Sequence, residues 1–190
     1  MRFLINLLFM FAIALGTGFG ASYYAVTDGR LLGALQIGPW IAWPDTGSPG
    51  PNPYTRAQIV RAGAFQLGTS EGLQFTAAAD SDGEPLTREC TYRLDGRTPV
   101  ATFWTLVAAD ASGANAAAAH GLPAIRSDAI ARAADGALAI TVGKRLSPGN
   151  WLELSGEGPF ALRLTLYDTT LTAGLSSALT LPSISRVACS

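Results

Sequence analysis

The N-terminal part of the chain is its longest apolar segment. No charged residue occurs between Arg2 and Asp28, and most side chains from Phe3 to Val26 are apolar. As a helix, this segment would extend about 36 Å, which exceeds the roughly 30 Å thickness of a bilayer's hydrocarbon core. We therefore predict that residues 1–27 form an N-terminal transmembrane helix, which anchors the chain in the inner membrane through residues 3–26.

The residues at the two ends of this segment predict its orientation. Arg2 precedes the apolar run, and Tyr23 and Tyr24 lie near its other end, which places the N-terminus in the cytoplasm and the following domain in the periplasm. The alternative is a cleaved signal peptide, because Leu7–Leu15 has the length of a signal-peptide core and small residues precede Ala21. Both interpretations export the domain.

Residues 28–52 are interpreted as a linker and an edge segment, because an apolar run broken by glycine and proline is followed by a proline-rich loop. Asn52 followed by Pro53 is typical of a helix start, and Gly68 is typical of a helix end. Between them, apolar residues recur every three or four positions, which predicts an amphipathic helix. The predicted apolar stripe comprises Tyr54, Ala57, Val60, Ala64 and Leu67.

From Leu73 onward the apolar period changes to two, as in half-buried strands. Alternating runs cover 73–77, 90–94 and 160–166, and runs that are apolar on both faces cover 100–107 and 137–142. Asp-Gly pairs at 82–83, 95–96 and 135–136 predict tight hairpin turns, because glycine reaches positive φ without strain. The Ala-rich segment 108–123 is interpreted as a loose surface loop.

Many short strands with one helix indicate an antiparallel, jelly-roll-like β-sandwich over residues 53–190. Removing residues 1–27 leaves 163 of the 190 residues, which suits one domain. This remainder holds 12 Lys and Arg (13 minus Arg2) against 14 Asp and Glu, without blocks of like charge. The balance predicts no nucleic-acid partner.

The chain has two cysteines, Cys90 at the start of a predicted strand and Cys189 at the penultimate position. An oxidising periplasm allows such a pair to persist as a disulfide. The bond would tie the C-terminal tail to the sheet and close a loop of about 100 residues, which stabilises by about 4 to 5 kcal/mol in the chain-entropy model. The alternative is two separate buried thiols.

The sequence contains no convincing catalytic or metal motif. Gly68–Gly72 matches G-x-S-x-G, but a helix precedes it and a strand follows, the reverse of a nucleophile elbow. The only histidine, His120, lies in the Ala-rich loop. Asp80–Glu84 begins like a calcium loop but matches only in part, and is better explained as a solvated turn. No catalytic residue, metal ligand or cofactor is therefore assigned.

Two kinds of residue remain as candidates for binding. Four aromatic residues, Trp104, Trp151, Tyr92 and Tyr167, can line an aromatic ligand face, although such residues in strands more often pack in a core. Arg163 lies opposite the apolar face of its strand, where it can bond an anionic ligand or a carboxylate such as Asp80, Asp82 or Glu71. The plainer interpretation of Arg163 is an exposed side chain on a solvated sheet face.

Several short motifs resemble a known family. They include Glu71-Gly72-Leu73, Asp80-Ser81-Asp82-Gly83, Phe103-Trp104-Thr105-Leu106, Asp135-Gly136, Gly149-Asn150-Trp151-Leu152 and Leu162-Arg163-Leu164-Tyr167. Their order is similar to that in the bacterial family catalogued as domain of unknown function 1214. The resemblance covers about two thirds of the chain and implies a jelly-roll-like β domain, but no settled activity and no catalytic residue.

These observations give one candidate ligand-binding set. It comprises Asp80, Asp82, Trp104, Asn150, Trp151, Arg163 and Tyr167.

We expect a membrane-anchored periplasmic β-sandwich that acts as a binding or envelope-associated module and not as an enzyme. Its expected partners are an envelope protein, or a small-molecule or glycan ligand. The first alternative is an envelope hydrolase that cleaves a glycan or another polymer with paired carboxylates. The second alternative is a structural subunit that forms homo-oligomers through its sheet edge or anchor helix.

Overall fold

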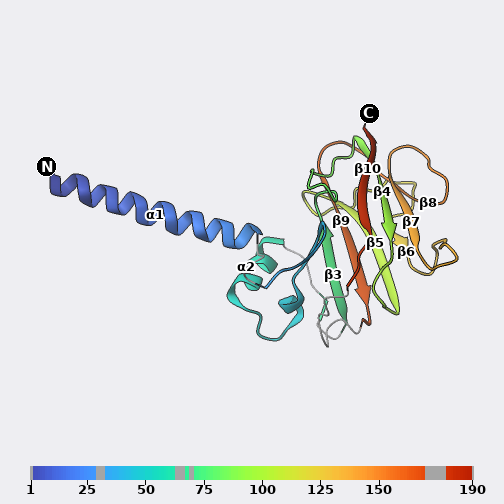
Figure 1. Cartoon of the computed structure of the whole chain (residues 1–190), viewed down its shortest axis with the longest axis horizontal. Helices are drawn as coiled ribbons and strands as arrows, with labels where there is room; N and C mark the ends of the chain where they lie inside the picture. The colour runs from blue at the N-terminus through green and yellow to red at the C-terminus, as the bar shows by residue number, and fades with distance from the viewer. Residues whose placement is uncertain (1, 29–32, 63–66, 69–70, 170–178, 190) are drawn as a thin grey trace.

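The computed structural model describes residues 2–28, 33–62, 67–68, 71–169 and 179–189. A long N-terminal helix, α1, precedes a short helix, α2, and a domain of two β-sheets (Figure 1). The protein is therefore mainly β, with a single long apolar helix at its N-terminus.

Helix α1 (Arg2–Asp28) contains a span, Arg2–Ala25, that is long and apolar enough to cross a membrane. None of this span is buried against the rest of the chain, and α1 projects away from the sheets in Figure 1. A helix that is apolar on all sides and uncovered by protein suits a lipid environment. A signal sequence has the same length and composition, so the helix supports a membrane anchor or a signal sequence.

The larger sheet has six strands in the order β1-β2-β3-β9-β5-β6, and all neighbouring strands in it are antiparallel. Its strands are β1 (Leu35–Ile37), β2 (Trp40–Ala42), β3 (Gly72–Ala77), β5 (Phe103–Asp110), β6 (Ile125–Arg126) and β9 (Phe160–Tyr167). Strands β3, β5 and β9 alternate buried and partly exposed residues along most of their length. This matches the period of two, because one face packs inward and the other faces outward.

The smaller sheet has four strands in the order β10-β4-β7-β8. Its strands are β4 (Cys90–Gly96), β7 (Leu138–Gly143), β8 (Asn150–Glu153) and β10 (Ser183–Cys189). Strands β7 and β8 are parallel, so the prediction of a purely antiparallel sandwich was wrong. Residues 144–149 carry the chain back along β7 instead of reversing it into a hairpin, and the two-layer arrangement does not establish a jelly roll.

The hydrophobic core lies between the two sheets. Its largest fully buried side chains include Trp40, Phe75, Tyr92, Leu106 and Leu152. Trp40 comes from the short β2 strand, and its indole N–H donates to the carbonyl of Pro182 at 2.7 Å. The edge segment preceding α2 is thus an integral part of the core.

The Asp-Gly turns are confirmed at two of three positions. Gly83 and Gly136 have positive φ and lie in tight turns between bridged segments. Gly96 also has positive φ but lies within β4, where an added Cβ would meet the Cα of Pro182 at 3.2 Å. The expected hairpin at 95–96 was wrong because β4 and β5 belong to different sheets, so the chain crosses the sandwich after Gly96.

Helix α2 (Pro53–Ala62) begins as predicted, because the Asn52 side-chain oxygen accepts the backbone N–H groups of Tyr54 and Thr55. The predicted apolar stripe was wrong: Tyr54 and Val60 are exposed, whereas Thr55 is completely buried. The Thr55 hydroxyl accepts a hydrogen bond from the Asn52 amide, which turns this face of α2 toward the preceding loop. Residues 63–66, where the predicted helix continues, lie outside the described residues.

The Ala-rich segment is also more ordered than predicted. Strand β5 extends to Asp110, whose carboxylate accepts N–H groups from Ser112 and Ala114 and caps the following turn. Ala116 is buried in the core, and Ala117 forms a bridge with Leu154. The small alanine side chains allow the backbone of this segment to pack closely against the sandwich.

Candidate functional site

A pocket of about 350 Å³ lies at the end of the sandwich where β4 leads into β5. Residues 98–104 form one wall, and Ser127, Asp128 and Arg132 from the loop between β6 and β7 form the other. The volume is within the range of small-molecule sites. The first wall comes from the segment between β4 and β5 and the start of β5, and the second wall comes from the loop between β6 and β7.

Trp104 forms the floor between the pocket and the core. It lies on β5 and is only 2% exposed, and its indole N–H has no hydrogen-bond acceptor among the described residues. The Arg132 guanidinium carbon lies 5.8 Å from the centre of the indole ring. A buried N–H without an acceptor costs free energy, and a cation over an aromatic face recovers only a modest amount.

The charges in the pocket are unequal. Asp128 accepts the Arg126 Nε–H at 3.0 Å, and this pairing lowers the pKa of the Asp128 carboxyl and raises the pKa of the Arg126 guanidinium. Arg132 has no carboxylate partner among the described residues and donates only weakly to the carbonyl of Gly136, at 3.5 Å. Asp128 is thus already neutralised, and the charge left for a ligand is the positive charge of Arg132.

The loop that carries Arg132 is fixed by Asn150. The Asn150 side-chain oxygen accepts the N–H of Ala131 at 2.8 Å, and its amide nitrogen donates to the carbonyls of Ala131 and Ala139 at 2.8 and 2.9 Å. One side chain on β8 therefore holds both backbone groups of the residue next to Arg132. Asn150 is a positioning residue for this wall.

Two further contacts fix the opposite wall. The Ser127 hydroxyl accepts the backbone N–H of Trp104, and the Ser127 N–H donates to the Trp104 carbonyl. The Thr102 hydroxyl donates to the Asp168 carboxylate at 2.8 Å. Asp168 has a φ of 48°, the only positive value at a non-glycine among the described residues, and a short polar side chain tolerates this conformation best.

A family model described as "Protein of unknown function (DUF1214)" matches residues 71–171, which is more than half of the chain. The chain belongs to this family. The match contains every residue of the pocket wall and Asn150, so the pocket is formed entirely within the DUF1214 domain. The family resemblance expected from the sequence is confirmed.

Two solved structures resemble this DUF1214 chain. The VPA0106 protein from Vibrio parahaemolyticus has a TM-score of 0.58 and 20% sequence identity, over 71% of this chain and 35% of that protein. A putative uncharacterized protein from Burkholderia cenocepacia has a TM-score of 0.44 and 18% identity, over 64% and 30%. The first likeness supports the fold, and the chain spans about a third of the length of either structure. None of the curated proteins compared with the chain matches it.

The structure brings three of the seven candidate residues to the pocket. Trp104 forms its floor, Asn150 supports its wall, and Tyr167 packs on the wall residue Phe103 with ring centres 5.7 Å apart. These three lie on different strands, and only their positions at the same end of the sandwich bring them together.

The other four candidates lie elsewhere. Asp80 is buried and pairs with Arg186, while Asp82 is exposed at the tip of the same turn. The suggested contact between Arg163 and Asp80 or Asp82 is therefore not formed; the Arg163 guanidinium lies beside Gly113. Trp151 donates its indole N–H to the carbonyl of Gly143 at 3.1 Å, a bond that joins β8 to the end of β7.

Sequence reasoning missed Arg132, Ser127 and Asp128. Arg132 is an isolated charge in an Ala-rich segment, and no period or motif distinguishes it there. Asp128 is the only carboxylate among the described residues that line the pocket. No group of three His, Cys, Asp or Glu side chains in the described part of the chain is close enough to hold a metal ion.

Proposed function

We propose that this DUF1214 protein is a membrane-anchored periplasmic binding module that holds a small anionic organic ligand in the pocket above Trp104. The observation that carries the proposal is the position of Arg132 in the pocket wall. This cation has no carboxylate partner among the described residues, and it lies over the ring of Trp104, whose buried N–H lacks an acceptor there. A ligand with a carboxylate group and a flat apolar part complements both.

The rigidity of the walls supports binding. Asn150, Ser127 and the Thr102–Asp168 pair hold the two walls through hydrogen bonds of 2.8 to 3.1 Å. A wall that is fixed before binding loses little conformational entropy when the ligand arrives. The membrane location rests on α1, which carries an apolar span long enough to cross a membrane. The periplasmic location is supported by the predicted disulfide, which the structure contains between Cys90 and Cys189 and which favours an oxidising compartment.

The proposal is tested with benzoate and its uncharged analogue benzamide as probes. The full chain in detergent micelles is titrated while the indole N–H signals of its tryptophans are followed by ¹⁵N NMR. We expect benzoate to shift the Trp104 signal in a saturable way and benzamide to bind on the order of tenfold more weakly, because it lacks the charge that Arg132 neutralises.

The matched variants are Arg132→Gln and Arg93→Gln. Arg93 is an exposed arginine of β4 that pairs with Asp95 and does not line the pocket. Arg132→Gln should remove the preference for benzoate, while Arg93→Gln should retain it. Equal responses to both probes in the unmodified chain, or a preference that survives Arg132→Gln, would show that the pocket is not an anion site.

A further inference from the structure

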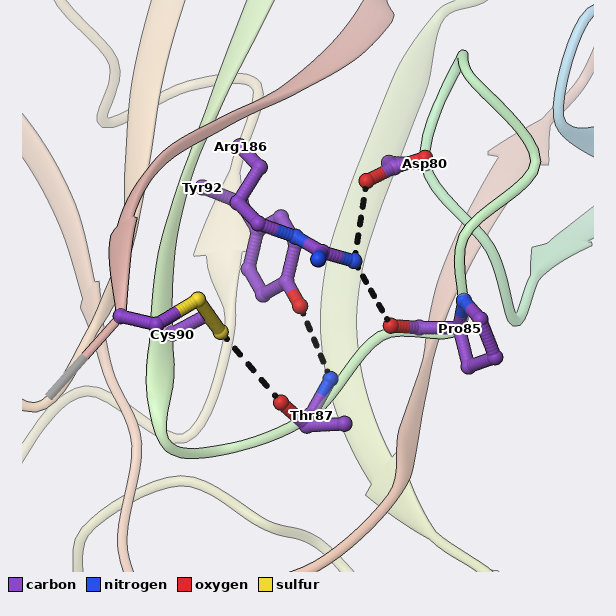
Figure 2. Close-up of a disulfide and its surroundings, with 7 residues drawn as sticks. Asp80, Pro85, Thr87, Cys90, Tyr92 and Arg186 are labelled. Carbon is purple, nitrogen blue, oxygen red and sulfur yellow. Dashed lines mark hydrogen bonds and ion pairs between the residues drawn. A yellow bond between two sulfur atoms is a disulfide. The ribbon is translucent and has the colours of Figure 1, made fainter.

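A second hollow, of about 160 Å³, lies at the opposite end of the sandwich. It is lined by Arg88, Glu89, Cys90, Thr91, Lys144, Arg145, Ala188 and Cys189. The seven residues of β4 separate it from the Trp104 pocket by about 20 Å. Both cysteines of the chain line this hollow, and they form a disulfide between Cys90 and Cys189 (Figure 2).

The two sulfur atoms are not equivalent. Cys90 begins β4 and is only 6% exposed, whereas Cys189 lies on the edge strand β10 and is exposed. The Thr87 hydroxyl lies 3.5 Å from the Cys90 sulfur and can donate a hydrogen bond to it, as the dashed line in Figure 2 shows. An approaching nucleophile therefore meets Cys189 first, and the Thr87 hydroxyl offers one hydrogen bond to Cys90 as the leaving group.

The hollow is positively charged. Arg88, Lys144 and Arg145 contribute three cations, and Glu89 is the only carboxylate among the described residues of its lining. The Glu89 carboxylate accepts a hydrogen bond from the N–H of Gly158 at 2.7 Å. This bond is the main reason that the pKa of Glu89 is lowered. The net field attracts an anion and favours a thiolate over a thiol.

We propose that this hollow is a site of thiol–disulfide exchange, and that the Cys90–Cys189 bond is the substrate of an anionic thiol or dithiol. The incoming thiolate attacks the Cys189 sulfur, a bond forms between these two sulfurs, and the Cys90–Cys189 bond breaks. Cys90 leaves as a thiolate that accepts the Thr87 hydroxyl. A second thiol of the reductant then attacks the mixed disulfide. The reductant is oxidised to its disulfide, and the protein gains two thiols, a transfer of two electrons.

Strand β10 is held to the rest of the domain by contacts that do not depend on the disulfide. Arg186 of β10 crosses the ring of Tyr92 and bonds to Asp80 and to the carbonyl of Pro85, which ties β10 to the loop before β4 independently of the disulfide (Figure 2). The pairing between β10 and β4 is irregular between Arg186 and Ala188. Reduction therefore frees the segment from 188 onward, while Arg186 keeps the rest of β10 in place.

The test measures reduction rates of the folded, detergent-solubilised chain at low salt. The small probes are 3-mercaptopropionate and 2-mercaptoethanol, compared at equal thiolate concentration, and the protein probe is reduced thioredoxin. Alkylation and mass spectrometry follow Cys90 and Cys189. We expect the anionic small thiol to form its mixed disulfide on Cys189. Faster mixed-disulfide formation by 3-mercaptopropionate than by 2-mercaptoethanol supports the proposal, and the thioredoxin arm shows whether a protein dithiol also reaches the site.

The variants isolate the charge. In a Lys144→Gln/Arg145→Gln variant, the rate ratio of 3-mercaptopropionate to 2-mercaptoethanol should fall on the order of fivefold, while in Arg93→Gln, on the same strand as Cys90 but outside the hollow, it should not change. Lys144→Gln alone should give a smaller fall if the double variant unfolds. The proposal is overturned if the disulfide is reduced only in denaturant or if the mixed disulfide forms on Cys90. It is also overturned if neither the Lys144→Gln/Arg145→Gln variant nor Lys144→Gln lowers the rate ratio of 3-mercaptopropionate to 2-mercaptoethanol.

Discussion

Arg186 connects strand β10 to the turn that contains Asp80. Its guanidinium lies 3.2 Å from the carboxylate of Asp80, whose side chain is 2% exposed, and 3.2 Å from the carbonyl of Pro85. The same carboxylate accepts the N–H groups of Asp82 and Glu84. A buried carboxylate keeps its charge only when it is paired and hydrogen-bonded in this way.

Replacing Arg186 should therefore destabilise the domain more than replacing an exposed arginine. We expect Arg186→Gln to lower the free energy of unfolding by about 2 to 3 kcal/mol, because Asp80 loses its counter-charge in a desolvated position. Arg93→Gln, which breaks an exposed pair, should cost less than about 1 kcal/mol. Urea unfolding of both variants in the same detergent measures the difference. Similar costs would mean that water replaces the guanidinium at Asp80.

Helix α2 shows how a short element is held by its N-terminal cap. The Asp45 carboxylate accepts the backbone N–H of Asn52 and the hydroxyl of Ser48, both at 2.7 Å, and Asn52 in turn caps the helix. The cap joins the 3₁₀ turn Pro44–Gly47 to α2. The buried face of α2 contains Thr55, which contacts the capping residue Asn52, and does not follow the predicted apolar stripe.

The same cap makes this region sensitive to acid. The pKa of Asp45 lies below its ordinary value of 3.8, chiefly because the Asn52 N–H bonds the charged form, and secondly because Ser48 does. A lowered folded-state pKa means that the stabilisation is present above the ordinary pKa and is lost as pH falls through the lowered value. We expect the Asn52 and Tyr54 amide signals, followed by NMR, to move together as pH falls below about 4.

An Asp45→Asn variant supplies the control for that titration. The side-chain amide that replaces the carboxylate does not ionise, so the joint movement of the two signals should disappear while those near the other titrating carboxylates still move. If the Asn52 signal still titrates in the variant, another group controls the cap.

At the scale of the whole molecule, the disulfide joins residues 99 positions apart and closes the edge of the smaller sheet. The core and the β4–β10 pairing hold the same edge without it. The disulfide thus adds stability to a fold that is already specified by packing, because it restricts the unfolded chain.

Replacing both cysteines should weaken the domain without unfolding it. We expect Cys90→Ser/Cys189→Ser to lower the free energy of unfolding by about 3 to 5 kcal/mol and to leave the far-UV circular dichroism spectrum unchanged. Urea unfolding under non-reducing conditions measures the loss. A variant that is unfolded in buffer would show that packing alone does not specify this edge.

The sequence predicted the parts of the fold that depend on local pattern. The strands of the core were found because a strand with one buried face repeats every two residues, and the helix start was found because Asn52 and Pro53 are specific for it. The direction of β8 could not be predicted, because it depends on the path of residues 144–149. The pocket could not be predicted either: Trp104, Arg132 and Asn150 are distant in sequence, and only the packed sheets bring them together.

Strand β10 comprises nearly the last residues of the chain, yet it pairs with β4, almost a hundred positions earlier. During synthesis, the smaller sheet lacks this edge until residues 183–189 have left the ribosome and, in an exported chain, the translocon. Pairing across such a separation also forms late, because a large loop must close before any contact is gained. The smaller sheet therefore gains its β10 edge only after residues 183–189 are available to pair with β4.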